Sequence, residues 1–108
     1  MYKLTECSIG AALILFATAA NAQPAGDAEA GKLRAGLCAG CHAIPGYRNA
    51  YPTYSVPKLG GQHAAYIVTA LKAYQTGQRS HPTMQAIAAS LSDKDMADLG
   101  AYFAGIQQ

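Results

Sequence analysis

Cys38-Ala39-Gly40-Cys41-His42 is the stretch of sequence that decides the fold. Two cysteines three positions apart project from the same side of a helical turn, so both sulfurs can reach the vinyl groups on one edge of a porphyrin. The histidine that follows can turn its imidazole toward the iron. Cys-x-x-Cys-His is typical of covalent haem attachment. We therefore expect Cys38 and Cys41 to form thioethers with one haem c, and His42 to bind its iron.

Two other kinds of site share the Cys-x-x-Cys spacing. A zinc site needs two further thiolate or imidazole ligands in a second cluster. Beyond the first 22 residues, however, the chain has no other cysteine and, besides His42, only the widely separated His63 and His81. A thioredoxin-like redox pair follows a strand in a βαβ pattern, which the sequence lacks. The sequence therefore favours haem attachment over both alternatives.

The start of the chain differs in character from the rest. Lys3 lies in a short polar lead, residues 9–20 form an apolar run, and Ala20-Asn21-Ala22 places small residues where a signal peptidase requires them. The run is shorter than the roughly 20 residues that a membrane-spanning helix needs. We expect residues 1–22 to be a signal peptide cleaved after Ala22, and residues 23–108 to be one domain exported to the periplasm.

Composition and charge exclude several classes of protein. The chain has 108 residues, of which 51% are hydrophobic and 13% are charged, and this suits one folded domain rather than a disordered segment. The formal net charge is only +2, and the basic residues form no run. A nucleic-acid partner is therefore not expected.

A helix is predicted over residues 27–39, and it would present the cysteines. Its apolar residues Ala30, Leu33 and Leu37 recur at helical spacing, and Asp27 is a plausible N-cap. A second helical pattern covers residues 62–76, with Gly77 just past its end. Its apolar positions are Tyr66, Ile67, Ala70, Leu71 and Tyr74.

The segment between these helices, residues 43–61, is rich in proline, glycine and tyrosine and has no sustained period. Such a segment is typical of a loop. We expect it to wrap around the haem rather than to form strands.

The last helix has the clearest sequence signals. Ser92 and Asp95 are spaced as in a capping box, and Leu91 and Met96 occupy the positions of a hydrophobic staple. Its buried stripe is expected to comprise Met96, Leu99, Phe103 and Ile106, with Tyr102 at the margin. Strand-like alternation is missing from the sequence. The predicted fold class is therefore all-α, with helices packed around one covalently bound haem that completes a small core.

Several segments together resemble the class I c-type cytochromes, in particular cytochrome c4 domains and the short periplasmic c553-like monohaem proteins. They are residues 26–32, 38–42, 57–67, 91–96 and 101–103, together with Met84. The resemblance implies that the first and last helices cross closely, with Gly31 on one and Tyr102 or Phe103 on the other. It also implies that a proline carbonyl accepts a hydrogen bond from the His42 ring, for which Pro52 and Pro57 both qualify.

Met84 is the residue that we expect on the other face of the iron. An electron carrier needs a strong ligand on both faces, and Met84 matches the position of the family's axial methionine, in a stretch, residues 80–84, expected to be non-helical. His81 would instead give bis-histidine ligation and a lower potential. Met96 is expected to fill the core, and His63 is expected to be a surface or capping residue. Haem propionates would find partners among Lys58, Arg79, Tyr47, Tyr51 and Tyr54.

The expected function is that of an electron carrier rather than an enzyme, because no nucleophile and base pair or paired carboxylates stand out beside the haem motif. Its partners would be redox proteins such as a dehydrogenase, a cytochrome complex or a terminal oxidase. Two alternatives remain open: an electron-accepting subunit of a larger dehydrogenase complex, and an open-site haem sensor or peroxidase-like protein. The latter requires that Met84 does not bind the iron.

Overall fold

Five helices are found in the computed structural model, which describes residues 24–51 and 53–107. They are α1 (Ala28–Arg34), α2 (Gly36–His42), α3 (Ala64–Gln75), α4 (Pro82–Ala89) and α5 (Asp93–Ala104). Within the same residues no strand forms, and the only β-type pairing is an isolated antiparallel bridge between Arg48 and Ser55. The all-α prediction is confirmed. The predicted signal peptide and its cleavage site lie outside the described residues.

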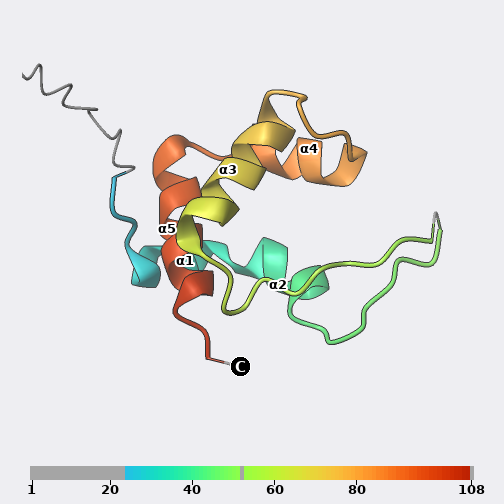
Figure 1. The fold of residues 1–108 in the computed structure, drawn as a ribbon, viewed down its shortest axis with the longest axis horizontal. Helices are drawn as coiled ribbons and strands as arrows, with labels where there is room; N and C mark the ends of the chain where they lie inside the picture. The colour runs from blue at the N-terminus through green and yellow to red at the C-terminus, as the bar shows by residue number, and fades with distance from the viewer. Residues whose placement is uncertain (1–23, 52, 108) are drawn as a thin grey trace, which may run out of the picture.

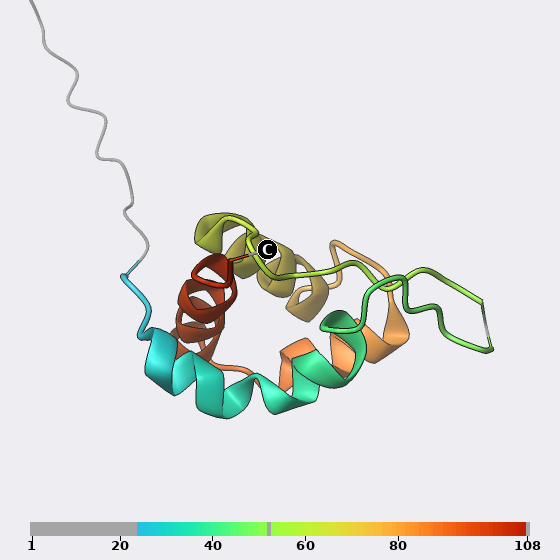
Figure 2. The same ribbon diagram turned by 90° about the horizontal axis from the view of Figure 1, so that it is seen from below.

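The helices are arranged so that α5 packs against both α1 and α3 at one end of the molecule, and α4 packs against α3 (Figure 1). α2 continues from α1 and lies across from α4, as the view turned by 90° also shows (Figure 2). The core between these helices contains Ile67, Leu71, Met96, Leu99 and Phe103, all of them buried.

The first helical segment differs from the prediction in two respects. Asp27 is the N-cap as expected, since its Oδ1 accepts hydrogen bonds from the backbone N–H groups of Glu29 and Ala30. The segment is, however, divided into α1 and α2 at Ala35. Its apolar residues do not form one buried stripe either, because Leu33 is 88% exposed and Leu37 lines the cavity described below instead of the helix core.

Small residues explain why that stripe does not face the core. Gly31 and Ala35 are the buried positions of the segment. A Cβ added to Gly31 would lie 2.1 Å from the carbonyl oxygen of Asp98 and 2.9 Å from the Cβ of Tyr102. α1 therefore approaches α5 backbone to backbone, which only glycine permits. The close crossing of Gly31 with Tyr102 is confirmed.

α5 begins as its sequence predicts. Ser92 Oγ accepts from the backbone N–H of Asp95 at 3.1 Å, and Asp95 Oδ2 accepts from the backbone N–H of Ser92 at 2.9 Å, which completes the capping box. The hydrogen bond that the Asp95 carboxylate accepts from the Ser92 backbone N–H is the largest cause that holds the pKa of Asp95 below its ordinary value. Leu91 and Met96, the expected staple pair, are both buried.

A second carboxylate joins α5 to α1. Asp98 Oδ1 accepts from the backbone N–H of Asp27 at 2.8 Å, and Oδ2 accepts from Lys94 Nζ at 2.5 Å. The pKa of Asp98 is lowered, first by the bond from Lys94 and then by the bond from Asp27. Asp98 is a buried acid whose two oxygens both have donors, so it stabilises the crossing of the two helices instead of weakening it.

α3 agrees with its prediction, and α4 does not. α3 ends at Gln75, and Gly77 follows with a φ of +79°, a conformation that glycine adopts without strain. Met84, expected in a non-helical stretch, lies in the first turn of α4. The helix starts there because His81 is its N-cap and Pro82 occupies the first helical position, where a missing N–H costs nothing.

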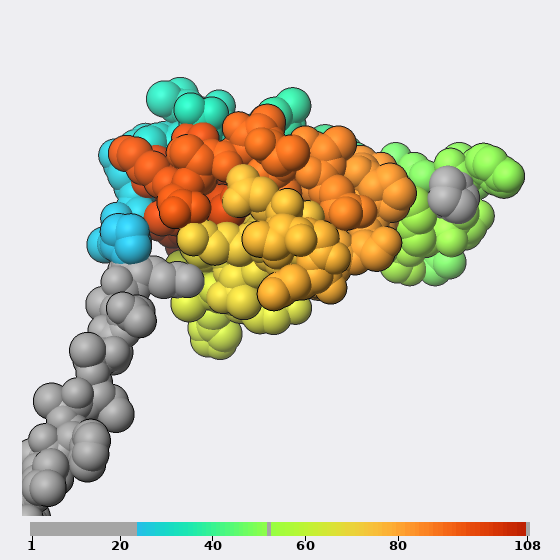
Figure 3. Space-filling model, turned by 90° about the horizontal axis from the view of Figure 1, so that it is seen from above, coloured from blue at the N-terminus to red at the C-terminus, as the bar shows by residue number. Residues whose placement is uncertain are grey.

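The long connection between α2 and α3 contains a hairpin, by which we mean residues 47–51 and 53–56. Its two sides are joined by the backbone bonds Asn49 N–H to Tyr54 O at 2.9 Å and Val56 N–H to Tyr47 O at 3.0 Å. The hairpin stands out from the body of the molecule (Figure 3). The loop prediction is thus correct in lacking regular strands. Of the hairpin, however, only the second side, residues 54–56, lines the space between the helices.

Candidate haem site

A cavity of about 450 Å³ lies between α2 and α4 and is bordered by α3, α5 and residues 54–59. Its walls are mainly apolar, which suits a large flat apolar ligand. The apolar lining includes Leu37, Val56, Leu59, Ile67, Leu71, Ile87, Leu99 and Phe103. Cys38, Cys41, His42 and Met84 line the same cavity. The four residues expected to hold the haem are therefore brought together, and the donor set fits haem c.

α2 delivers the first three of these residues. Cys38 and Cys41 lie one helical turn apart, and neither is in a disulfide. Cys38 is half-buried, and this burial raises the pKa of its thiol, whereas Cys41 is exposed. Two unpaired thiols on one helix face beside an apolar cavity match the requirement for two thioether bonds to one edge of a porphyrin.

His42 is held in one orientation by the loop. Its Nδ1 lies 2.5 Å from the backbone carbonyl oxygen of Pro57. A carbonyl can only accept, so Nδ1 carries the proton and Nε2 keeps its lone pair. This is the tautomer that a haem ligand needs, with the second nitrogen anchored by its N–H. Of the two prolines that the sequence left open, Pro57 makes this contact; Pro52 lies outside the described residues.

Met84 and Met96 differ in the way the sequence suggests. Met84 is half-buried, packs against the edge of the core and lines the cavity. Met96 is fully buried and does not line it. Of these two methionines, only Met84 is in a position to offer its sulfur to a group in the cavity.

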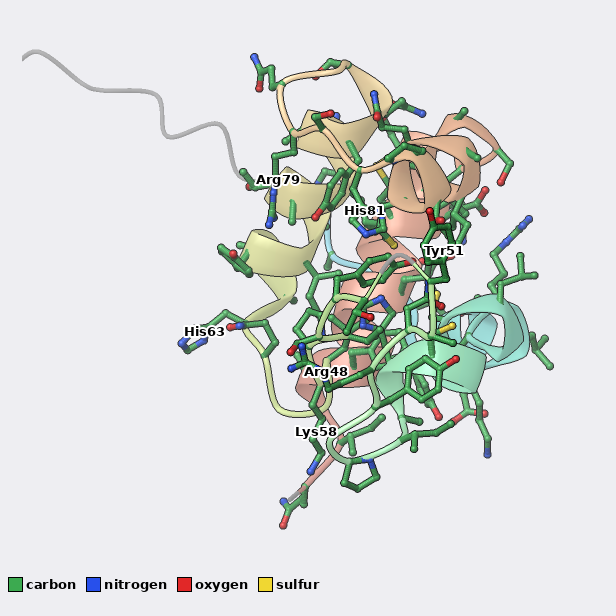
Figure 4. The ribbon with its side chains drawn as sticks, turned by 90° about the vertical axis from the view of Figure 1, so that its right-hand side faces the viewer. Arg48, Tyr51, Lys58, His63, Arg79 and His81 are labelled. Atoms are coloured by element: carbon green, nitrogen blue, oxygen red, sulfur yellow. The ribbon has the colours of Figure 1, made fainter. Side chains whose placement is uncertain are left out.

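The two remaining histidines have different environments. His63 is exposed, points away from the molecule and makes no side-chain capping bond at the start of α3 (Figure 4). His81 lines the cavity, but its Nδ1 accepts a hydrogen bond from the backbone N–H of Met84 at 3.4 Å. A neutral His81 therefore carries its proton on Nε2, which leaves no lone pair there for iron. This geometry favours Met84 over His81 as the ligand.

The expected propionate partners divide into two groups. Tyr54, Lys58 and Arg79 line the cavity, whereas Tyr47 and Tyr51 do not. Tyr51 is 92% exposed, near the tip of the hairpin. Figure 4 shows Lys58 and Arg79 on the side of the molecule from which the hairpin projects. Sequence reasoning did not anticipate Tyr74, whose ring lines the cavity and lies 4.6 Å from the guanidinium carbon of Arg79.

A helical fold in which a Cys-x-x-Cys-His helix and a methionine line one apolar cavity is that of a class I c-type cytochrome. The family model for cytochrome c matches residues 28–107. The chain belongs to the cytochrome c family, whose members carry covalently bound haem c and transfer electrons.

Individual relatives agree with this family. Cytochrome c-554(548) of Halomonas halodenitrificans is 44% identical over 82 residues, which cover 73% of this chain and 95% of that protein. Cytochrome c4 of Pseudomonas aeruginosa is 39% identical over 83 residues, 77% of this chain and 40% of that protein. The crystal structure of cytochrome c4 from Pseudomonas stutzeri matches with a TM-score of 0.57 and 34% identity, over 77% of this chain and 52% of that one. The chain thus spans only about half the length of that cytochrome c4.

One further relative has a name that describes its partner. It is the thiosulfate dehydrogenase electron acceptor of Stutzerimonas stutzeri, which is 39% identical over 64 residues, 59% of this chain and 29% of that protein.

Proposed function

We propose that this chain is a monohaem electron carrier in which Cys38 and Cys41 bind the porphyrin and His42 and Met84 bind the iron. The observation that carries the proposal is the single cavity lined by all four residues, with the His42 ring already in the required tautomer. The haem iron, when bound, supplies the chemistry by gaining and losing one electron. The chain's own residues then have to keep both ligands in place and keep water out.

Each residue contributes a physical property to that task. The Pro57 carbonyl fixes the His42 ring and increases the basicity of Nε2. The Met84 thioether favours iron(II) more than a second imidazole would, so a histidine and methionine pair raises the reduction potential. The apolar walls lower the local dielectric constant around the site. None of these roles converts a substrate, and we propose that the chain is not an enzyme.

The experiment that tests the ligand assignment compares two methionine variants of the exported holoprotein. Mass measurement after extraction with acidified acetone should show haem that stays attached to the wild-type chain. Met84→Ala should lose the weak near-red absorption band of sulfur-ligated ferric haem, and its reduced form should bind carbon monoxide rapidly. Met96→Ala is the matched control, because it should keep the band while losing about 2–5 kcal/mol of stability through a core cavity.

The outcomes separate the open alternatives. A near-red band that survives in Met84→Ala would show that another residue binds the iron. Rapid carbon monoxide binding by the reduced wild-type protein would favour the sensor or peroxidase-like alternative.

We also propose that the chain is exported to the periplasm, with residues 1–22 removed as a signal peptide. No helix in the part of the chain that the structure describes is long and apolar enough to cross a membrane. The mass of the exported protein tests the cleavage directly, since it should equal that of residues 23–108 plus one haem.

The distribution of charge suggests how a redox partner approaches. Every Asp and Glu of residues 24–51 and 53–107 lies on α1 or α5 or at their N-caps. The cavity, by contrast, is lined by Lys58 and Arg79 and by no carboxylate among the residues described. We therefore propose that partners with an acidic surface dock at the cavity. Oxidation of ferrocyanide, an anion, should slow with added salt and should be slower in Lys58→Glu than in Lys72→Glu, because Lys58 lines the cavity and Lys72 does not.

A second candidate is an electron-accepting subunit of a dehydrogenase complex. It is favoured by the relative named for that role and by the exposed Tyr51 on the projecting hairpin. Purification of the tagged protein from its native host would distinguish the two, because a subunit copurifies with a dehydrogenase in fixed stoichiometry and a free carrier does not.

A further inference from the structure

The first turn of α4 carries Met84 and is held by unusual means. α4 has only eight residues, and a helix this short has little stability of its own. Pro82, at the first helical position, has no N–H, and His81 Nδ1 accepts from the N–H of Met84. Gln85 Oε1 in return accepts from the backbone N–H of His81 at 3.2 Å. The two bonds form a reciprocal cap around the residue that is to bind iron.

Histidine is an uncommon choice for this position, since Ser, Thr, Asp and Asn are the preferred N-caps. The ring of His81 makes contacts that these shorter side chains cannot reach. It meets the Tyr54 ring edge to face, with centroids 4.7 Å apart and an interplanar angle of 83°. It also lies 6.4 Å from the Tyr74 ring, at an angle of 79°. The hairpin and α3 thus fix the direction in which Nδ1 points.

We infer that His81 is a positioning residue for Met84: it caps α4 and so holds the Met84 backbone where the sulfur can reach the cavity. This inference rests on the proposed role of Met84 as iron ligand. In this role His81 would not bind the iron, because the cap uses its Nδ1 lone pair and a neutral ring then carries its proton on Nε2. Tyr54 links the same ring to the hairpin, so the position of the hairpin is coupled to that of Met84.

The test replaces His81 in the holoprotein by two residues. His81→Leu removes the acceptor and keeps side-chain volume, whereas His81→Asn keeps an acceptor that can cap the Met84 N–H. The first readout is hydrogen exchange of the Met84 amide, which donates the cap bond directly and can be measured whether or not Met84 binds the iron. The second is the temperature at which the near-red band is lost, compared with the temperature of global unfolding.

Two controls match these variants. His63→Leu alters the other N-cap histidine, whose side chain makes no capping bond. Gln75→Leu loosens the far end of α4, where Gln75 Nε2 donates to the carbonyl oxygen of Ala88 at 3.0 Å.

We expect His81→Leu to speed Met84 amide exchange roughly fivefold, the usual effect of losing an N-cap. In His81→Leu the temperature at which the near-red band is lost should fall, relative to wild type, by more than the temperature of global unfolding falls. His81→Asn should restore both the exchange rate and the temperature of band loss, and neither control should change the exchange rate of the Met84 amide. This inference alone would be overturned if His81→Leu left the Met84 exchange rate and the temperature of band loss unchanged. It would also be overturned if His81→Asn changed both as much as His81→Leu does. A near-red band that persists in Met84→Ala would overturn both the assignment of Met84 as ligand and this inference.

Discussion

Gly31→Ala is the substitution for which the structure makes the sharpest prediction about stability. The added Cβ would lie 2.1 Å from the Asp98 carbonyl oxygen and 2.6 Å from its carbonyl carbon, whereas side-chain Cβ atoms essentially never approach closer than 3.0 Å. Both atoms belong to the backbone of α5, so no side chain can swing aside to make room. α1 and α5 would have to separate along their whole contact.

The size of the effect follows from two costs and one gain in stability. Overpacking typically costs 1–3 kcal/mol, and contact with rigid backbone places this case at about 3 kcal/mol. A gap of 0.5–1 Å elsewhere in the interface would also forfeit a quarter to a half of its dispersion energy. Alanine gains about 1 kcal/mol over glycine in helix propensity, which offsets only part of the cost. A net loss of about 2–3 kcal/mol corresponds to a fall in Tm of roughly 8–24 °C for a domain of this size.

The assay is urea and thermal unfolding of the holoprotein followed by far-UV circular dichroism. Gly36→Ala is the matched control, because a Cβ at that position, on the neighbouring helix, meets no atom within 4 Å. It should be neutral or stabilising by up to about 1 kcal/mol. If Gly31→Ala unfolds within about 0.5 kcal/mol of wild type, the backbone contact between α1 and α5 is wrong.

Three other predictions concern the N-cap of α5, the stability of the protein at low pH and the hairpin. Ser92→Ala should cost about 1 kcal/mol, measured by urea unfolding, because it removes the capping box of α5. The lowered pKa values of Asp95 and Asp98 mean that their contribution to stability is complete above the ordinary value of 3.8 and is lost as the pH falls through the lower folded-state pKa. The free energy of unfolding should therefore decline below about pH 4. Asp98→Asn should be less stable than wild type at pH 7, and its free energy of unfolding should decline less steeply in acid. An equally steep decline below about pH 4 in Asp98→Asn would contradict this. Tyr51→Ala, at an exposed position, should change stability by less than about 0.5 kcal/mol and leave the visible spectrum unaltered, and a shifted spectrum would place that ring at the haem.

Where local chemistry decides the structure, the sequence was a sufficient guide. The start of α5 depends on hydrogen bonds between residues three apart, so Ser92 and Asp95 predict it without knowledge of the rest of the fold. Attachment chemistry is local too, because the spacing of Cys38, Cys41 and His42 sets which side of one helix turn they share. The cavity brings these residues together with Met84, and both the haem attachment and the iron ligation remain predictions.

Where long-range contacts decide, periodicity misled. Leu33 has the spacing of a buried position, but α1 packs against α5 through Gly31, and a residue without a side chain adds nothing to a hydrophobic pattern. The sequence pattern does not predict α4, because a proline after Ser80 and His81 is more typical of a loop than of a helix interior. A proline directly after an N-cap is also a helix start signal, but histidine is not among the preferred N-cap residues.

The acceptor for the His42 ring is a main-chain oxygen, which has a consequence for how this protein can change over evolutionary time. Substituting the side chain at position 57 leaves the carbonyl in place, so drift in residue identity there is tolerated. Inserting or deleting a residue between His42 and the carbonyl, 15 positions downstream, would displace it and rotate the imidazole. The inherited constraint on this connection is therefore its length and path rather than its composition.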